Sequence, residues 1–296
     1  MNPLSRLALL WHEADSDARM HYGGFLQLLE RMRQLGFGDL AKLRVLDIGC
    51  GERAPLSLLL AAHGAEVDAL DLLPVRLGWR RPAMWLLLFR TSGARSTVKQ
   101  IVRDALHTIR YWRRLRRLLG RSLPFAAVRL RQGDAQRLEL ADEMFDFVVS
   151  TAVWEHLTDV RAATREVNRV LKGDGMGSIQ VALFPSLGGG HHAEWHDLSP
   201  GRRRTIRPWD HLLPGAQPLP LYCNGWRADQ FREVFEQETD LVCWELGEPR
   251  GAEYLTPALQ QELAGYSETD LLVGFVTAWV RKRQEYSASR RDWRPS

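Results

Sequence analysis

Cysteine is scarce in this sequence: there are three, Cys50, Cys223 and Cys243, and no two of them are close together. This spacing excludes a disulfide framework and a closely spaced cysteine metal motif, and it favours a reducing compartment. Long hydrophobic runs are also lacking, since none approaches the ~20 residues that cross a bilayer. Internal repeats and low-complexity segments are absent as well, which excludes a solenoid and a largely disordered chain.

What is present is ordinary for a globular protein: 45% of the 296 residues are hydrophobic, 26% are charged, and the net charge is +4. One domain with insertions, or one domain with a small cap, fits this length better than two equal domains. The first residues combine a short apolar patch with acids and lack a small-residue cleavage site. We therefore expect a helix of the mature protein there, not a signal peptide.

Strand-like and helix-like segments alternate along most of the chain. Seven segments have the length and apolar content of strands: 43–51, 66–72, 125–135, 145–157, 177–185, 240–246 and 270–282. Helical patterns occupy 1–42, 54–64, 159–175, 226–237 and 256–266. This alternation predicts a doubly wound, Rossmann-like α/β fold with a mostly parallel seven-stranded sheet.

Two stretches interrupt the alternation. Residues 75–125 predict a basic helical insertion after the second strand, and residues 185–222, rich in Gly, Pro, His and Trp, predict a substrate lid after the fifth. The predicted domains are therefore a helical cap (1–42), a core (43–184 and 223–284) that contains the insertion, and the lid.

The stretch VLDIGCG ends a predicted strand in two glycines, Gly49 and Gly51. Glycine lets the backbone approach a ligand closely at the carboxyl end of a parallel strand. Asp71 follows 20 positions after Gly51, at the end of the next strand, where an acid can accept both hydroxyls of a ribose. These residues together predict a nucleoside-binding loop.

Two further acids decide between nucleosides. A dinucleotide motif, G-x-G-x-x-A, is formally met by Gly49, Gly51 and Ala54, but Asp47 would repel a pyrophosphate and instead suits an ammonium or sulfonium. Asp134 follows the third strand in the sequence GDA, where its carboxylate can accept from an exocyclic amine such as adenine N6.

At this point the sequence resembles the class I S-adenosylmethionine-dependent methyltransferases. The motifs VLDIGCG, ALDL, GDA, FDFVVSTAVWEHL and REVNRVLKGDG occur in the order of that family, over roughly residues 43–184, and 236–282 extends the resemblance. One position departs from it, because Arg53 stands where a third glycine is often found.

The resemblance implies S-adenosyl-L-methionine as cofactor and a set of residues around it. It places Asp47 and Gly49 along the methionine part, with Gly51 making the close turn, and Asp71 on the ribose. The remaining implied contacts are Leu72 near the adenine, Asp134 and Ala135 at its amine, and Thr151 to Trp154 beside the sulfonium.

The predicted lid contains a cluster of polar residues: His191, His192, Glu194, His196, Asp197, Asp210 and His211. Three interpretations compete: a substrate pocket with one histidine as general base, a polar network that orders a long loop, and a metal site. We favour the pocket and expect no metal, because the spacing matches no standard helix-borne site.

Within that pocket, His192 is the preferred base because a GGG sequence precedes it; His191 and Glu194 are the other catalytic candidates. Trp195, His196 and Trp209 are candidates for substrate contact, with the two tryptophans able to stack on a sugar or ring. Packing of the lid is the alternative role for these tryptophans.

The insertion carries many Lys and Arg side chains and one acid, Asp104. Apolar residues recur in it at helical spacing: Ile101, Val102, Ala105, Ile109, Trp112, Leu115 and Leu119. A helix of this kind suits an anionic membrane surface or nucleic-acid phosphates. The alternative is a cap helix with a solvated basic face.

The predicted function is S-adenosylmethionine-dependent methylation, at oxygen, of a small-molecule, glycan or lipid-linked acceptor. The alternatives are an RNA methyltransferase that uses the arginine-rich helix and a non-catalytic protein that binds S-adenosylmethionine. We expect a cytoplasmic protein, with peripheral attachment to the inner membrane face as a variant.

Overall fold

The computed structural model describes residues 3–73, 102, 104–195, 198, 204–219 and 221–283. The chain divides into two compact units, residues 1–133 and 134–296. Ile101, His196 and Asp197 were named from the sequence but lie outside the described residues, as does the whole first half of the predicted insertion, residues 75–101. Among the described residues, no helix is both long and apolar enough to cross a membrane.

The first unit is a three-stranded parallel sheet with helices. Its elements are α1 (Pro3–Gln34), β1 (Arg44–Ile48), α2 (Pro55–Ala62), β2 (Glu66–Asp71), a helix at 104–119, η1 (Phe125–Ala127) and β3 (Val128–Gln132). Strand β2 is central and pairs in parallel with β1 and β3. The carboxyl ends of β1 and β2 therefore lie next to each other, which positions the loops that follow them.

Helix α1 buries one stripe, formed by Ala14, Ala18, Phe25 and Met32. These positions recur at helical spacing, which explains why a polar segment of 32 residues folds as one amphipathic helix. The helix ends at Gln34, with Gly36 in the left-handed conformation at φ 75°, before the end of the predicted 1–42 segment.

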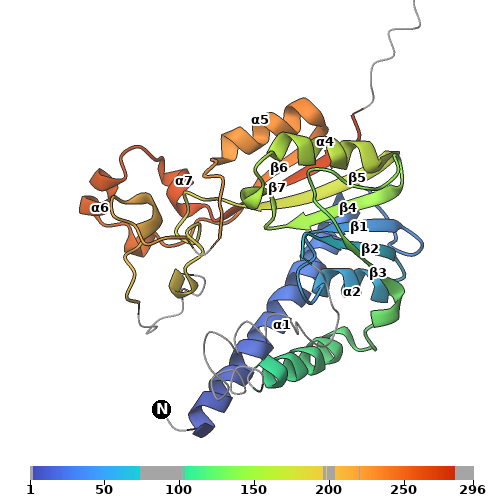
Figure 1. Ribbon diagram of the computed structural model, residues 1–296, viewed down its shortest axis with the longest axis horizontal. Coiled ribbons are helices and arrows are strands. Elements are labelled where there is room, and N and C mark those ends of the chain that lie inside the picture. The colour runs from blue at the N-terminus through green and yellow to red at the C-terminus, as the bar shows by residue number, and fades with distance from the viewer. Residues whose placement is uncertain are drawn as a thin grey trace, which may run out of the picture. The chain divides into compact units, whose positions relative to one another are not determined.

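The second unit contains four strands and several short helices, and its ribbons run from green to red in Figure 1. Its elements are β4 (Phe145–Thr151), η2 (Trp154–His156), α4 (Val160–Val170), β5 (Leu171–Ala182), η3 (Ala193–Trp195), η4 (Asp210–Leu212), α5 (Ala228–Glu238), β6 (Asp240–Leu246), η5 (Ala252–Tyr254), α6 (Pro257–Glu262), α7 (Glu268–Leu272) and β7 (Phe275–Arg281). Strand β5 pairs in parallel with β4 and antiparallel with β7, which pairs antiparallel with β6.

The strand order is β3-β2-β1-β4-β5-β7-β6 in a seven-stranded sheet. Only the pairings of β7 are antiparallel among those described, so the predicted mostly parallel, Rossmann-like α/β fold is confirmed.

Two predicted boundaries are wrong. The strand predicted to begin at Gly177 begins at Leu171, and the glycines of the sequence KGDG lie in a register shift between Leu171 and Met176. The segment 270–282 was predicted as one strand, but its first part belongs to α7. Ser267 and Asp270 form a capping box there, which stabilises a helical turn ahead of β7.

Part of the predicted lid forms a small core of its own. Leu187, Trp195, Trp209 and Leu213 pack with Leu259, Leu263, Leu271 and Leu272 in one buried cluster. The last four residues come from α6, α7 and the turn between them. This cluster gives the loop-rich segment a hydrophobic anchor within the second unit.

Candidate functional site

The loop after β1 is shaped by its glycines. Gly49 and Gly51 have φ values of 71° and 68°, a conformation that favours glycine. The Gly49 amide donates to the Leu70 carbonyl at 2.7 Å, and the Gly51 amide donates to the Asp71 carboxylate at 3.0 Å. The first loop is thus tied directly to the end of β2.

Asp47 is a buried carboxylate on β1, only 3% exposed. Its single described side-chain partner is Ser57 on α2, whose hydroxyl donates to it at 2.5 Å. Burial, with a smaller contribution from the neighbouring Asp71 charge, raises the pKa of Asp47 to about 6. No lysine or arginine among the described residues contributes to that pKa, so a cationic ligand would supply the missing charge.

Asp71 ends β2 and is held by two backbone amides. It accepts from Gly51 and from Leu73, the latter at 2.9 Å. The next residue, Leu72, is 66% exposed. A carboxylate beside an exposed apolar side chain suits a ribose followed by an aromatic base.

Arg53 links this loop to the rest of the first unit. Its guanidinium lies 3.3 Å from His107 Nδ1, 3.9 Å from the Asp17 carboxylate and 5.1 Å from the centre of the Tyr111 ring. His107 and Tyr111 belong to the helix at 104–119, and Asp17 belongs to α1. The residue that departs from the family's glycine therefore anchors the loop to two helices.

In the second unit, Asp134 is held by Gln136. The Gln136 backbone amide donates to Asp134 Oδ1 at 2.9 Å, and its side-chain amide donates to both carboxylate oxygens. Gln136 Oε1 in turn accepts from the Thr158 hydroxyl and the Asp159 amide, just before α4. No local sequence pattern predicts this role of Gln136. Ala135 beside it is buried.

The segment after β4 contains Thr151 and Trp154. Thr151 is exposed at the end of the strand. Trp154 is fully buried, and its indole donates to the Thr164 hydroxyl on α4 at 3.1 Å. A cofactor contact from Trp154 would therefore come from its backbone.

Part of the chain matches a known family. Residues 89–179 match the family model described as "Methyltransferase domain". This match supports the resemblance of the chain to the class I S-adenosylmethionine-dependent methyltransferases. The cofactor of this family is S-adenosyl-L-methionine, and Asp47 fits it, because a buried carboxylate without a cationic neighbour suits the ammonium of the donor's methionine part.

Three similar proteins illustrate the relationship. The chain is 29% identical to a malonyl-[acyl-carrier protein] O-methyltransferase of Geobacter sulfurreducens, over 67% of this chain and 62% of that protein. It is 48% identical over 48 residues to an uncharacterized methyltransferase, YcgJ, of Bacillus subtilis, which is 16% of this chain and 19% of the relative. The chain thus spans less than two thirds of these curated relatives. A solved S-adenosylmethionine-dependent methyltransferase from Mesorhizobium loti is 17% identical, with a TM-score of 0.46, covering 85% of this chain and 96% of the other.

The predicted lid places the three catalytic candidates differently. Glu194 accepts from the Thr205 amide, the Thr205 hydroxyl and the Ile206 amide, and these bonds lower its pKa to about 2. Glu194 therefore orders the loop, which is the role that the polar-network interpretation gave to this cluster. His192 Nε2 is buried and has no hydrogen-bond partner among the described residues. His191 lies beside His156 instead, with ring centres 4.9 Å apart.

Both candidate tryptophans are in the buried lid cluster. Trp209 is fully buried, and its indole donates to the Leu271 carbonyl at 3.1 Å. Trp195 is 6% exposed and packs edge-on against Tyr254, with Arg204 over both rings. Their placement favours packing of the lid over stacking on a substrate.

The helix at 104–119 buries Tyr111 and Leu115, whereas Val102 is 51% exposed. On the side toward α1, Arg110 forms a two-pronged ion pair with Asp15, and Tyr111 contacts His21. The arginines at 113, 116 and 117 remain exposed. This arrangement has the packed face and the solvated basic face that the cap-helix alternative requires.

Proposed function

We propose that this protein transfers the methyl group of S-adenosylmethionine to an oxygen atom of a small-molecule, glycan or lipid-linked acceptor. The observation that carries the proposal is the pair Asp47 and Asp71 at the ends of neighbouring strands, one suited to an ammonium and the other to a ribose. The O-methyltransferase name of the Geobacter relative supports oxygen as the acceptor atom.

Methyl transfer from a sulfonium needs little covalent help from the protein. The acceptor oxygen attacks the methyl carbon in line with the S–CH₃ bond, which breaks to leave a neutral thioether, and the acceptor proton passes to a base. His192 is the proposed base, because its buried Nε2 has no partner among the described residues and so can accept that proton.

The first test is calorimetry with S-adenosylmethionine and S-adenosylhomocysteine on the purified protein. Both should bind, since both carry the ammonium, the ribose and the adenine. If neither compound bound, both a methyltransferase and a non-catalytic S-adenosylmethionine-binding protein would be excluded.

The second test concerns His192. The variant His192→Gln should bind the donor normally but lose about 10²-fold or more in kcat with an acceptor identified by screening. The variant His211→Gln is a control on the same lid, because that imidazole already hydrogen-bonds the Phe184 carbonyl. A near-normal kcat for His192→Gln would exclude it as the base.

We further propose that the exposed arginines of the helix at 104–119 hold the enzyme on an anionic membrane surface. Arg113, Arg116, Arg117 and Arg121 line one shallow depression at the end of this helix. A lipid-linked acceptor would be presented at such a surface. An RNA methyltransferase, the alternative, would use the same arginines on phosphates.

A further inference from the structure

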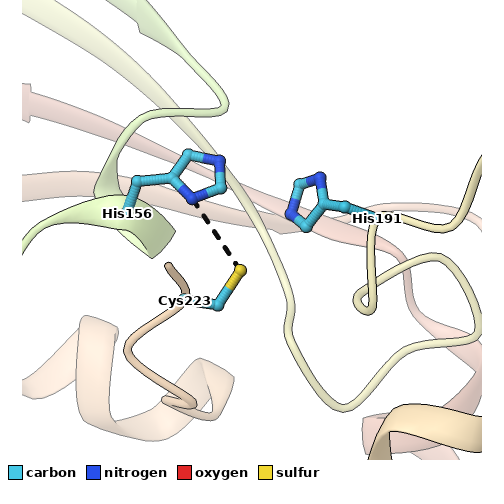
Figure 2. A group of neighbouring side chains, drawn as sticks. All are labelled: His156, His191 and Cys223. Carbon is cyan, nitrogen blue, oxygen red and sulfur yellow. Dashed lines mark hydrogen bonds between the residues drawn. The ribbon is translucent and has the colours of Figure 1, made fainter. Parts of the chain in front are cut away.

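Three side chains of the second unit face one small space: His156, His191 and Cys223 (Figure 2). One ring nitrogen of each histidine and the Cys223 sulfur all lie within 4.8 Å of one another. His156 is in η2 after β4, His191 follows β5, and Cys223 precedes α5. The three are far apart in sequence, which is why no spacing motif revealed them.

The His156 ring is oriented for coordination. Its Nδ1 lies 2.7 Å from the Tyr222 carbonyl. A carbonyl only accepts, so Nδ1 carries the hydrogen and Nε2 presents a lone pair. Histidine ligands of metals are typically fixed in this way by a backbone carbonyl on the other nitrogen.

Cys223 is held next to this ring by its neighbour Asn224. The Asn224 amide donates to the Glu155 carbonyl at 2.8 Å, and its side chain donates to the Trp154 carbonyl at 2.8 Å. Cys223 Sγ is 3.8 Å from His156 Nδ1. The segments that carry His156 and Cys223 are therefore held together by hydrogen bonds of the protein itself, before any metal binds.

The loop that carries His191 is equally specific. The His191 amide donates to the Gly188 carbonyl at 3.0 Å, and His191 itself has a φ of 53°, which a non-glycine residue rarely adopts. A Cβ at Gly189 would lie 2.0 Å from the Phe184 carbonyl oxygen, so only glycine fits there. This tight turn directs the imidazole toward the other two side chains.

A fourth group lies beside the cluster. The Glu155 side chain is 1% exposed, and one carboxylate oxygen is 3.8 Å from His156 Nε2. No side chain among the described residues hydrogen-bonds this carboxylate, which faces only the backbone amides of Glu155 and Ala182. A buried carboxylate in this state is stabilised by a nearby cation.

We propose that His156, His191 and Cys223 bind one Zn²⁺ ion, with the Glu155 carboxylate beside it as the fourth group. Two imidazole nitrogens and one thiolate are a donor set that Zn²⁺ prefers, and tetrahedral zinc holds such atoms about 3.5 Å apart. On binding, the Zn–S bond forms as the S–H bond breaks, and the proton leaves to solvent. The ion joins the segments that follow β4 and β5 to the one that precedes α5.

The test uses the full-length protein and zinc alone. The protein is stripped with a chelator, dialysed against Zn²⁺ and analysed for bound metal, and a parallel sample is loaded with Co²⁺. We expect one ion per chain and a thiolate-to-cobalt charge-transfer band in the near-ultraviolet spectrum. The variants Cys223→Ser and His191→Ala should each weaken zinc binding by more than about tenfold, and Cys223→Ser should abolish the band.

A matched control is Cys243→Ser, which removes a half-buried thiol on β6 in the same unit and should leave binding unchanged. If Cys223→Ser fails to fold, the melting temperature of the wild type is decisive, because an ion that binds the native state raises it. Wild type without bound zinc, or equal binding by Cys223→Ser and wild type, would overturn the proposal. The metal measurements do not depend on methyl transfer, so the two proposals can fail separately.

Discussion

Asp47 and Asp68 are two buried aspartates on neighbouring strands with opposite surroundings. Asp68, fully buried on β2, is paired with Arg131 at 2.6 Å and with Arg129 at 3.4 Å. Among the described residues, Asp47 has only Ser57, through its hydroxyl and its backbone amide. A buried charge that the fold leaves without a counter-ion costs stability and is typical of a ligand site.

This contrast predicts opposite effects of the same substitution. Asp47→Asn should weaken binding of S-adenosylhomocysteine by more than about tenfold without lowering the melting temperature. Asp68→Asn should lower the free energy of unfolding by about 2 kcal/mol, because it removes the buried carboxylate that accepts charged hydrogen bonds from the half-exposed Arg131 and Arg129, while donor affinity stays near wild type. Calorimetry and thermal melts on both variants measure this, and a destabilised Asp47→Asn variant with normal affinity would contradict it.

The raised pKa of Asp47 also predicts a pH dependence. Its pKa is about 6 in the folded protein, and the donor's ammonium requires the ionised form. Affinity should therefore be constant above pH 7 and fall toward tenfold per pH unit below about pH 6. Asp47→Asn should show no such fall.

The free energy of unfolding depends on pH in the opposite direction to the donor affinity. A folded-state pKa above the ordinary aspartate value of 3.8 means that the native state holds the proton more tightly, so this residue favours folding at low pH and loses that contribution as pH rises through about 6. The stability gain of Asp47→Asn over wild type should accordingly be largest near pH 8 and vanish toward pH 4, as measured by urea unfolding.

At the scale of elements, the lid cluster should behave as a separate packing unit. Trp209→Ala removes a fully buried indole from it, at a cost of about 3–5 kcal/mol locally. Backbone amides at 204–219 should then exchange hydrogen much faster, while donor affinity, whose predicted contacts lie outside the lid, should remain. Trp209→Phe, which keeps the packing and loses only the bond to the Leu271 carbonyl, should cost about 1 kcal/mol. Equal effects of the two variants would contradict the packing role.

The order and type of most elements could be predicted from the sequence, because the spacing of apolar residues and the positions of glycines indicate the same helices and strands. In α4, for example, Val160, Val167 and Val170 recur at helical spacing and form part of its buried face. The start of α7 was missed although Ser267 and Asp270 supply a capping box, because the apolar run after them has the composition of a strand.

Some residues of the candidate site could likewise be predicted from the sequence, and others could not. The glycines and acids after β1 and β2 could be found because they are adjacent in sequence to their strands. Gln136, Arg53 and the pair His156 and Cys223 act through contacts between distant segments, which no local pattern encodes. Glu194 could be named as a polar lid residue, but its bonds to Thr205 and Ile206 depend on how the loop closes.

At the scale of the whole molecule, the net charge of +4 is small, so attraction to an anionic surface would depend on the local concentration of arginine. Replacing Arg113, Arg116 and Arg117 by Gln should weaken flotation with anionic vesicles by about 10²-fold, at about 1 kcal/mol per residue. Added salt should also weaken it, because salt screens the attraction.

A control variant replaces three exposed arginines that are paired with acids, at positions 165, 207 and 232. It removes the same charge from another part of the surface. Equal loss in both triple variants, or retention on RNA instead of vesicles, would contradict membrane attachment.

Arg53 connects the predicted donor loop to the helix at 104–119. Its guanidinium contacts that helix, and its backbone belongs to the loop between Gly51 and α2. A partner that displaced the helix would therefore remove the contacts that hold this loop. If the affinity for the donor changed as a result, the donor would change the affinity for that partner by the same factor.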